Sequence, residues 1–426
     1  MNFNGVDDGK FRTCADTSPL NSYSNITTKD IMANYQIQTL NQISSKGLQR
    51  LPAARYTVGP TVTTPDAILV RSHKMHEMPI GASVLAIGRA GAGTNNIPVA
   101  ELSKRGIPVF NAPGANANAV KELVLAALLL ASRNLIPAMN YVNGLNADAP
   151  DLEKQVEDGK KQFAGTELPN RTLGIIGLGA IGSMVADTAL KLGMKVIGYD
   201  PEITVDAAWR LPASVTKANR IEDVLRQSDF VTLHLPLIAP TRHLINAERL
   251  AVMKPDAVLL NFARDAIVDD NAVVVALREK KLKAYLCDFP SPALLAEKGV
   301  LAFPHLGAST DEAEENCAVM VADQVRDYLE HGTILNAVNF PNVDMPRESA
   351  YRIAIANSNM PNMLGQISTA LAASGLNIHN MVNKSRGDMA YTLVDVDSPI
   401  PAAAVAAISD IEGVLAVRAI PVQDAA

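Results

Sequence analysis

The sequence predicts an α/β fold with two doubly wound domains, each built on a parallel sheet, followed by a small C-terminal βαββαβ unit. Strand-like and helix-like segments alternate from Tyr35 to about residue 305, which is typical of parallel sheets. Several of the predicted strands are apolar without alternation, as strands covered on both faces are. After residue 348 the order changes to strand, helix, two strands, helix, strand. The polar segment 1–30 is expected to be a disordered tail.

Composition limits the possible functions. The chain has 426 residues, of which 48% are hydrophobic, and its net charge is −6. A length of this size indicates two or three domains, and the lack of a basic patch argues against a nucleic-acid partner. Cys14, Cys287 and Cys317 fit neither a zinc site nor a disulfide framework, which favours the cytoplasm. No apolar run is long enough to span a membrane.

The first α/β set begins near residue 31. Its expected strands are Tyr35–Leu40, Ala67–Arg71, Val84–Gly88 and Pro108–Asn111, with a helix near Val99–Arg105. A long helix over Asn118–Arg133 follows. Its stretch Leu123–Leu130 is apolar all round, so we expect it to be buried and to connect the two domains.

The second α/β set runs to residue 305. Its expected strands are Thr172–Ile176, Lys195–Tyr199, Phe230–Leu233, Val258–Asn261, Ala284–Cys287 and Val300–Phe303. A helix then starts at Ser309–Thr310, where Ser309 and Glu312 have capping-box spacing. Gly332 is expected to end that helix. Pro341–Arg347 is predicted to be a polar linker.

A glycine-rich loop follows the first strand of the second set. Gly177, Gly179 and Gly182 form a G-x-G-x-x-G sequence, and Asp200 ends the next strand, which matches the Rossmann fingerprint. These glycines permit the turn, the approach of the pyrophosphate and close helix packing. The phosphates would meet the helix N-terminus at Ala180 and Ile181. Asp200 would accept ribose hydroxyls and repel a 2′-phosphate, so NAD is predicted over NADP. The alternative is a set of turn glycines and a surface acid.

Three polar residues follow later strands of the same set. Arg264 could hold a carboxylate through two parallel hydrogen bonds, or form a surface salt bridge. Asp288 could be catalytic, cofactor-binding or a helix cap. His305 has a side chain able to accept a proton from a hydroxyl near neutral pH, although a lone histidine is often structural. The carboxyl ends of strands are where ligands gather in open α/β sheets.

The order of these motifs resembles the D-2-hydroxyacid dehydrogenases. The sequence reads G-x-G-x-x-G…D, then N-x-A-R, then D-F-P, then P-H-L-G-A-S-T. The segments 70–72, 87–97 and 105–113 also resemble the family's substrate-domain motifs. The resemblance implies a substrate domain of residues 31–116 and 306–340 and an NAD-binding domain of residues 117–305.

The resemblance also implies roles for individual residues. His305 would be the general base, and Arg264 would hold the substrate carboxylate. A substrate phosphate would face Arg71, Ser72 and Arg89, and the cofactor would lie beside His234, Ala263 and Asp288. The family's usual glutamate partner for the histidine is missing from segment 288–294, and Glu297 is the nearest acid downstream. His305 is therefore expected to have a lower pKa and a less fixed orientation, unless another acid substitutes.

Residues 348–426 resemble an ACT domain, a βαββαβ module that binds amino acids. Its loops place Asn357, Asn359 and Asn377 at the positions that would bind a serine effector. Asn357 and Asn362 depart from residues common in relatives, so a purely structural dimerisation domain is the alternative. The module implies 3-phosphoglycerate as substrate and a homodimer or homotetramer. The competing hypotheses are a sibling enzyme for another 2-hydroxy or 2-oxo acid, and a non-catalytic NAD-sensing module.

Overall fold

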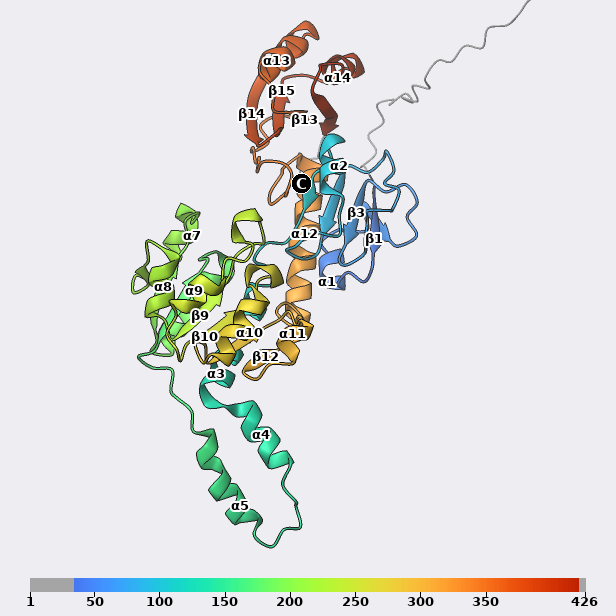
Figure 1. Cartoon of the computed structure of the whole chain (residues 1–426). Helices are drawn as coiled ribbons and strands as arrows, with labels where there is room; N and C mark the ends of the chain where they lie inside the picture. Colours follow the sequence, from blue (N-terminus) through green and yellow to red (C-terminus); the bar gives the residue numbers. More distant parts are fainter. Residues whose placement is uncertain (1–33, 421–426) are drawn as a thin grey trace, which may run out of the picture. The chain divides into compact units, whose positions relative to one another are not determined.

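The computed structural model describes residues 34–420, which form three sheets (Figure 1). The predicted tail of residues 1–30 and Cys14 lie outside the described residues. Two of the sheets are parallel and the third is antiparallel. Within residues 34–420, no helix combines the length and the apolar character needed to cross a bilayer.

The first sheet is parallel, with the order β2-β1-β3-β4-β5. Its strands are β1 (Tyr35–Leu40), β2 (Tyr56–Gly59), β3 (Ala67–Val70), β4 (Ala86–Arg89) and β5 (Val109–Phe110), with the helices α1 (Ser45–Leu48) and α2 (Val99–Lys104). The edge strand β2 was not predicted. The strand order reverses between β1 and β3, and such a reversal opens a crevice at the carboxyl ends of the strands.

The second sheet is also parallel, with the order β12-β11-β10-β9-β6-β7-β8. The strands are β6 (Thr172–Ile176), β7 (Lys195–Tyr199), β8 (Thr216–Lys217), β9 (Phe230–Leu233), β10 (Val258–Asn261), β11 (Ala284–Cys287) and β12 (Val300–Ala302). The helices are α6 (Ala180–Lys191), α7 (Val205–Trp209), α8 (Ile221–Gln227), α9 (Ala247–Ala251), α10 (Asp270–Arg278) and α11 (Pro292–Leu295), with short 3₁₀ turns at Ala239–Thr241 and Asp265–Ile267. This is the Rossmann order, and it reverses between β6 and β9.

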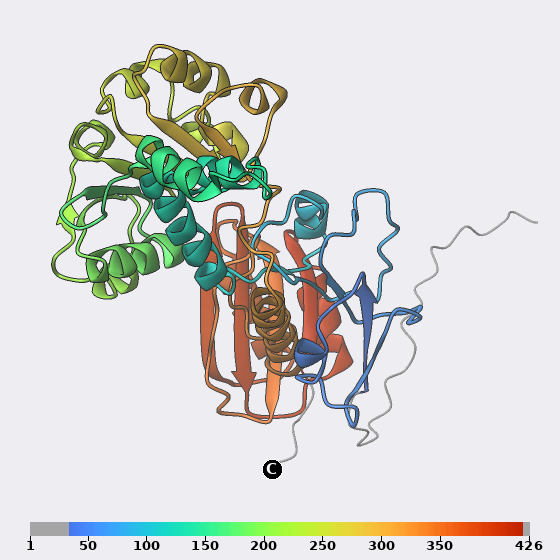
Figure 2. The same cartoon turned by 90° about the horizontal axis from the view of Figure 1, so that it is seen from below.

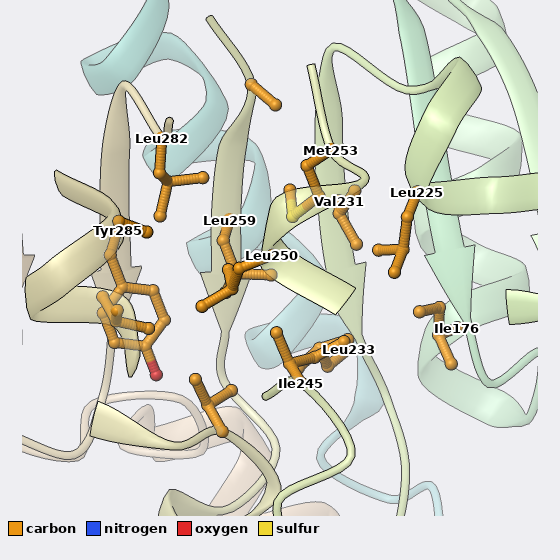
Figure 3. Close-up of a cluster of buried hydrophobic side chains, with 14 of the residues drawn as sticks. Ile176, Leu225, Val231, Leu233, Ile245, Leu250, Met253, Leu259, Leu282 and Tyr285 are labelled. Carbon is orange, nitrogen blue, oxygen red and sulfur yellow. The ribbon is translucent and has the colours of Figure 1, made fainter. Parts of the chain in front are cut away.

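Apolar side chains cover both faces of the second sheet, as the continuous apolar strands predicted. Leu259 and its neighbour Leu260 on β10 are both fully buried, and they belong to different core clusters. Figure 3 shows the cluster on the Leu259 face, where strand residues such as Val231 and Leu233 meet Leu250 and other side chains from the covering helices. A strand that is buried on both faces ends in a fixed position, so the residues that follow it are held firmly.

The helix α3 (Ala117–Arg133) packs on the second sheet and on α6. The prediction that its apolar stretch is buried all round was wrong for Leu129, which is 41% exposed, although Val124 and Leu128 are buried. After Asn134, α4 (Leu135–Asn143) and α5 (Leu152–Gly159) form a helical hairpin that runs away from the sheet (Figure 1). A 3₁₀ turn over Lys160–Phe163 leads back.

The long helix α12 (Asp311–His331) packs against β4 and α1 of the first sheet. The predicted capping residue was wrong by one position, because the side chain of Thr310, not of Ser309, accepts a hydrogen bond from the Ala313 amide at 3.1 Å. Gly332 ends the helix with a left-handed φ of 74°, as predicted. Segment 341–347 is not a purely polar linker, since Val343 and Met345 are buried.

The third sheet is antiparallel, with the order β14-β15-β13-β16 (Figure 2). Its elements are β13 (Tyr351–Ser358), α13 (Met363–Ala373), β14 (Ile378–Arg386), β15 (Met389–Val396), α14 (Ala402–Ser409) and β16 (Val414–Ile420). The βαββαβ prediction is therefore confirmed. Side chains such as Ile355 and Val394 pack against the two helices. The opposite face meets the end of α12, where Tyr391 donates to the Gly332 carbonyl at 2.8 Å.

Candidate active site

The glycine-rich loop between β6 and α6 is shaped by backbone contacts. Gly177 has a φ of 94°, and a β-carbon there would lie 2.3 Å from the His234 carbonyl oxygen. A β-carbon on Gly182 would lie 2.0 Å from the Gly177 carbonyl oxygen, so close packing forbids a side chain at both positions. A β-carbon on Gly179 would meet no atom within 4 Å. The loop is therefore tight on its protein side and open at the start of α6.

The start of α6 is available to an anionic ligand. No side chain caps α6, so the backbone amides of its first turn, at Ala180 and Ile181, are available to an anion. Asp200 accepts hydrogen bonds from the Leu178 amide at 2.8 Å and from the Glu202 amide at 3.0 Å, one on each oxygen. Each carboxylate oxygen has a second lone pair. The Asp200 carboxylate is thus fixed in place and can still accept a hydroxyl.

His234 follows β9 at the point where the sheet reverses. Its Nε2 lies 3.0 Å from the Thr232 hydroxyl oxygen, whereas its Nδ1 is buried without a hydrogen-bond partner. Burial lowers the pKa of His234 to about 3, so its ring is neutral in the folded protein. A buried ring nitrogen without a partner indicates a polar group that a ligand could satisfy.

The loop that carries His305 is held by Asp288, which follows β11 and is 1% exposed. The Asp288 carboxylate accepts hydrogen bonds from the Leu306 amide at 2.8 Å and from the Gly307 amide at 2.7 Å. Its backbone carbonyl accepts a third from the His305 amide at 3.1 Å. These three bonds hold His305 at a positive φ of 56°, a left-handed conformation that is uncommon for a residue other than glycine. Asp288 therefore positions the histidine through its backbone.

The imidazole of His305 is exposed and contacts the ring of Phe289 edge-on, with centroids 4.9 Å apart. Among the side chains that the structure describes, none places a carboxylate oxygen within 4.0 Å of the imidazole nitrogens. Glu297, the nearest downstream acid, instead accepts from Arg278 at 2.7 Å. The described residues thus supply no replacement for the missing glutamate, and an aromatic ring supports the imidazole in its place.

Arg264 lies at the end of β10, where a buried amide supports it. Asn261 is fully buried and donates to the Arg264 carbonyl at 2.8 Å, while its side-chain oxygen accepts from the Ala263 amide at 3.2 Å. The Arg264 guanidinium donates to the Ala263 carbonyl at 2.5 Å. It also approaches the first sheet's domain, because a β-carbon on Gly93 would lie 3.5 Å from Arg264 Nη2.

Two further arginines follow neighbouring strands of the first sheet. Arg89 ends β4 and donates through Nε to the Arg71 carbonyl at 3.1 Å. Burial, and then the positive charges of Arg264 and Arg71, lower the pKa of Arg89, which the Cys317 thiol partly offsets. The guanidinium of Arg71 donates through both of its terminal nitrogens to Glu314. Three guanidinium groups from two sheets are thus close enough for Arg264 and Arg71 to affect Arg89, and positive charge gathered in this way attracts anions.

Sequence reasoning missed Glu314 and Asn261. Asn261 carried a signal, because a polar residue that ends an apolar strand is expected at a ligand-binding edge. Glu314 carried none beyond the acidic first turn of its helix, since its pairing with Arg71 joins residues far apart in the sequence. Ser72 was predicted to contact the substrate; it is exposed, and its amide donates to the Asn41 side chain at 3.2 Å.

The three asparagines of the C-terminal module do not meet within one chain. Asn357 is buried at a β-bulge of β13 with its side-chain oxygen unpartnered, and Asn359 donates to the Gly387 carbonyl at 3.0 Å. Both lie at the end of the sheet where the last residues of β13 pair with Ala390 and Met389, the first residues of β15. Asn377 precedes β14 at the other end of the sheet, where its amide donates to Asp397 at 3.3 Å.

Comparison with known proteins gives related sequences for most of the chain. A profile described as "D-isomer specific 2-hydroxyacid dehydrogenase, NAD binding domain" matches residues 125–307. The D-3-phosphoglycerate dehydrogenase of Escherichia coli is 33% identical over 366 residues, which are 82% of this chain and 84% of that protein. The protein of the same name from Methanocaldococcus jannaschii is 38% identical over 263 residues. The chain spans about half the length of this second relative, since the match covers 48% of it.

Two solved structures share the fold of most of this chain. The crystal structure of NAD⁺-bound 3-phosphoglycerate dehydrogenase from Entamoeba histolytica superposes with a TM-score of 0.57 and 26% identity, covering 72% of this chain and 99% of that one. A protein from Thermus thermophilus, TT0316, gives a TM-score of 0.57 and 27% identity, covering 71% of this chain.

Proposed function

Because the chain belongs to the family of D-isomer-specific 2-hydroxyacid dehydrogenases, we propose that it oxidises 3-phosphoglycerate with NAD to 3-phosphohydroxypyruvate. The observation that carries this proposal is the group of three arginines, Arg71, Arg89 and Arg264, contributed by two sheets. A substrate with a carboxylate at one end and a phosphate at the other needs cationic groups at two places. This reaction is a first step towards serine.

Arg264 binds the substrate carboxylate, since Asn261 holds its backbone at the carboxyl end of β10 and a planar guanidinium can grip a carboxylate through two parallel hydrogen bonds. Arg71, Ser72 and Arg89, from the other sheet, face the phosphate. His305 takes the proton of the C2 hydroxyl as the general base. Asp288 acts by positioning, because it anchors three successive backbone amides of the His305 loop.

The residues around the glycine-rich loop fit NAD. Gly177, Gly179 and Gly182 with the amides of Ala180 and Ile181 would hold the pyrophosphate, and Asp200 would bind the adenosine ribose. His234, Ala263 and Asp288 lie at the edge where the nicotinamide would sit, and the unpartnered Nδ1 of His234 supports this placement. When bound, NAD accepts the hydride from C2 of the substrate.

The domain ranges proposed are residues 31–116 with 306–340 for substrate and residues 117–305 for NAD. Packing of α12 against β4 supports the assignment of that helix to the substrate domain. The thiols of Cys287 and Cys317 are free, which favours the cytoplasm.

For the C-terminal module, residues 348–426, we propose the role of an ACT domain that binds serine. The buried, unpartnered oxygen of Asn357 supports a polar ligand near the end of β13. Asn377 lies at the opposite end of the same sheet, so a site that uses all three asparagines requires modules from two chains. This geometry supports a homodimer or homotetramer.

A second candidate is a sibling activity on an unphosphorylated 2-hydroxy acid. It is favoured because Arg71, the residue proposed to bind a phosphate, already forms an ion pair with Glu314.

The deciding experiment measures NADH formation from NAD and 3-phosphoglycerate, with hydrazine to trap the oxo product, with and without serine. NADH formation that serine suppresses would support both the proposed reaction and the proposed binding of serine by the C-terminal module. Failure to form NADH, together with reduction of glyoxylate or hydroxypyruvate by NADH, would favour the sibling activity. Binding of NAD without turnover of any of these substrates would favour a non-catalytic NAD-sensing module.

A further inference from the structure

The contact between Arg71 and Glu314 affects the proposed phosphate site directly. We infer that Glu314 is a specificity-determining residue: it occupies the edge of Arg71 that a substrate phosphate would bind, and so it weakens the binding of phosphorylated ligands. This inference rests on the proposed role of Arg71, and it concerns a side chain from a different element, the first turn of α12.

The geometry is that of two parallel hydrogen bonds. Nη1 of Arg71 lies 2.8 Å from one Glu314 oxygen, and Nη2 contacts the other oxygen. A phosphate binds a guanidinium through the same pair of N–H groups as a carboxylate does. Because this edge of Arg71 cannot bind both anions at once, a phosphate must displace Glu314 or bind beside its negative charge.

Glu314 places a negative charge beside the three arginines of the proposed substrate site. Among the acidic side chains that the structure describes, it is the only one with a carboxylate within 4.0 Å of the guanidinium groups of Arg71, Arg89 or Arg264. It therefore removes one of three positive charges from the site. A phosphate group carries about −1.5 to −2 at neutral pH, so it is repelled by Glu314 more strongly than an unphosphorylated ligand is.

The position of Glu314 in a helix N-terminus does not by itself explain this contact. The helix dipole favours acids in the first turn, and Asp311 and Glu312 are there as well. The neighbouring Glu315 pairs with Lys46 of α1 at 2.5 Å, away from the arginines. Glu315 therefore provides a matched control: it is the same residue type, on the same turn, and it is also ion-paired.

The test is the binding of two ligands to the full chain saturated with NADH, which cannot oxidise them, measured by titration calorimetry. The ligands are 3-phosphoglycerate and D-glycerate, which lacks the phosphate. We expect E314Q to lower the Kd of 3-phosphoglycerate about fivefold and to leave that of D-glycerate unchanged, because a half-exposed ion pair contributes up to about 1 kcal/mol. E315Q should change neither Kd. In a chain that also carries R71A, E314Q should lose its effect.

An unchanged or higher Kd for 3-phosphoglycerate in E314Q would overturn the inference, and a higher value would mean that Glu314 orients Arg71 for the phosphate. Equal tightening of both ligands would also overturn it, as would no binding of 3-phosphoglycerate by either protein. If wild type binds 3-phosphoglycerate without oxidising it and E314Q binds it more tightly, the proposed reaction fails but this inference stands.

Discussion

Replacement of Asp288 by asparagine tests how the His305 loop is held. The carboxylate accepts from two backbone amides, those of Leu306 and Gly307, whereas an asparagine side chain offers one acceptor oxygen and one donor nitrogen. One amide would therefore lose its partner inside the protein. A hydrogen bond to a charged group contributes about 1.5–3 kcal/mol. Losing one such bond, at a middle value of about 2 kcal/mol, would reduce the population of the catalytically competent loop conformation about 30-fold.

The assay compares kcat/KM for D288N with the dissociation constant of NAD, which can be followed by fluorescence titration. We expect kcat/KM to fall about 30-fold while the affinity for NAD changes little. E297Q is the matched control, because Glu297 lies on the same β11–β12 connection and pairs with Arg278 outside the loop. If NAD affinity falls as much as kcat/KM does, Asp288 is a cofactor ligand and not an anchor of the loop. A kcat/KM close to wild type would refute the reasoning altogether.

Three further predictions concern the general base, a half-buried histidine and a buried ion pair. His305→Ala should lower turnover at least ~100-fold with NAD affinity retained, and near-normal turnover would remove His305 from its assigned role. His234 has a folded pKa of about 3 and an unfolded pKa of about 6.5. The unfolded chain therefore takes up the proton first, and the folded state loses stability as the pH falls below the unfolded value. Urea unfolding near pH 7.5 and 5.5 should show that H234Q removes about 1.4 kcal/mol of this pH dependence, and an identical dependence in both proteins would contradict the assignment. Arg352 and Asp395 are 1% and 0% exposed and form an ion pair, so R352A should lower the free energy of unfolding by about 3–5 kcal/mol. The exposed pair of Lys191 and Asp187 provides the control K191A, with an expected change of at most about 1 kcal/mol; equal effects of R352A and K191A would argue against a structural role for the buried pair.

Much of the fold was predictable because the order of apolar, polar and glycine residues reflects the burial and the backbone conformation of each segment. Six strands of the second sheet were predicted almost to the residue, since a strand covered on both faces must be apolar throughout. The exposed edge strand β8 of that sheet was missed. Gly332 was predicted to end α12 because a left-handed backbone favours glycine. The short edge strand β2 was missed, since it has too few residues to show a pattern, and the hairpin of α4 and α5 was missed as well.

The sequence by itself determined which residue types stand at the carboxyl ends of the strands, because these positions follow apolar runs that can be read directly. The glycine-rich loop, Asp200, Arg264 and His305 were all predicted in this way. Only the tertiary structure decided what these residues contact. The anchoring of the His305 loop by Asp288 and the pairing of Arg71 with Glu314 join residues from different elements. Such contacts depend on how the elements pack, and the spacing of residues along the chain carries no record of that packing.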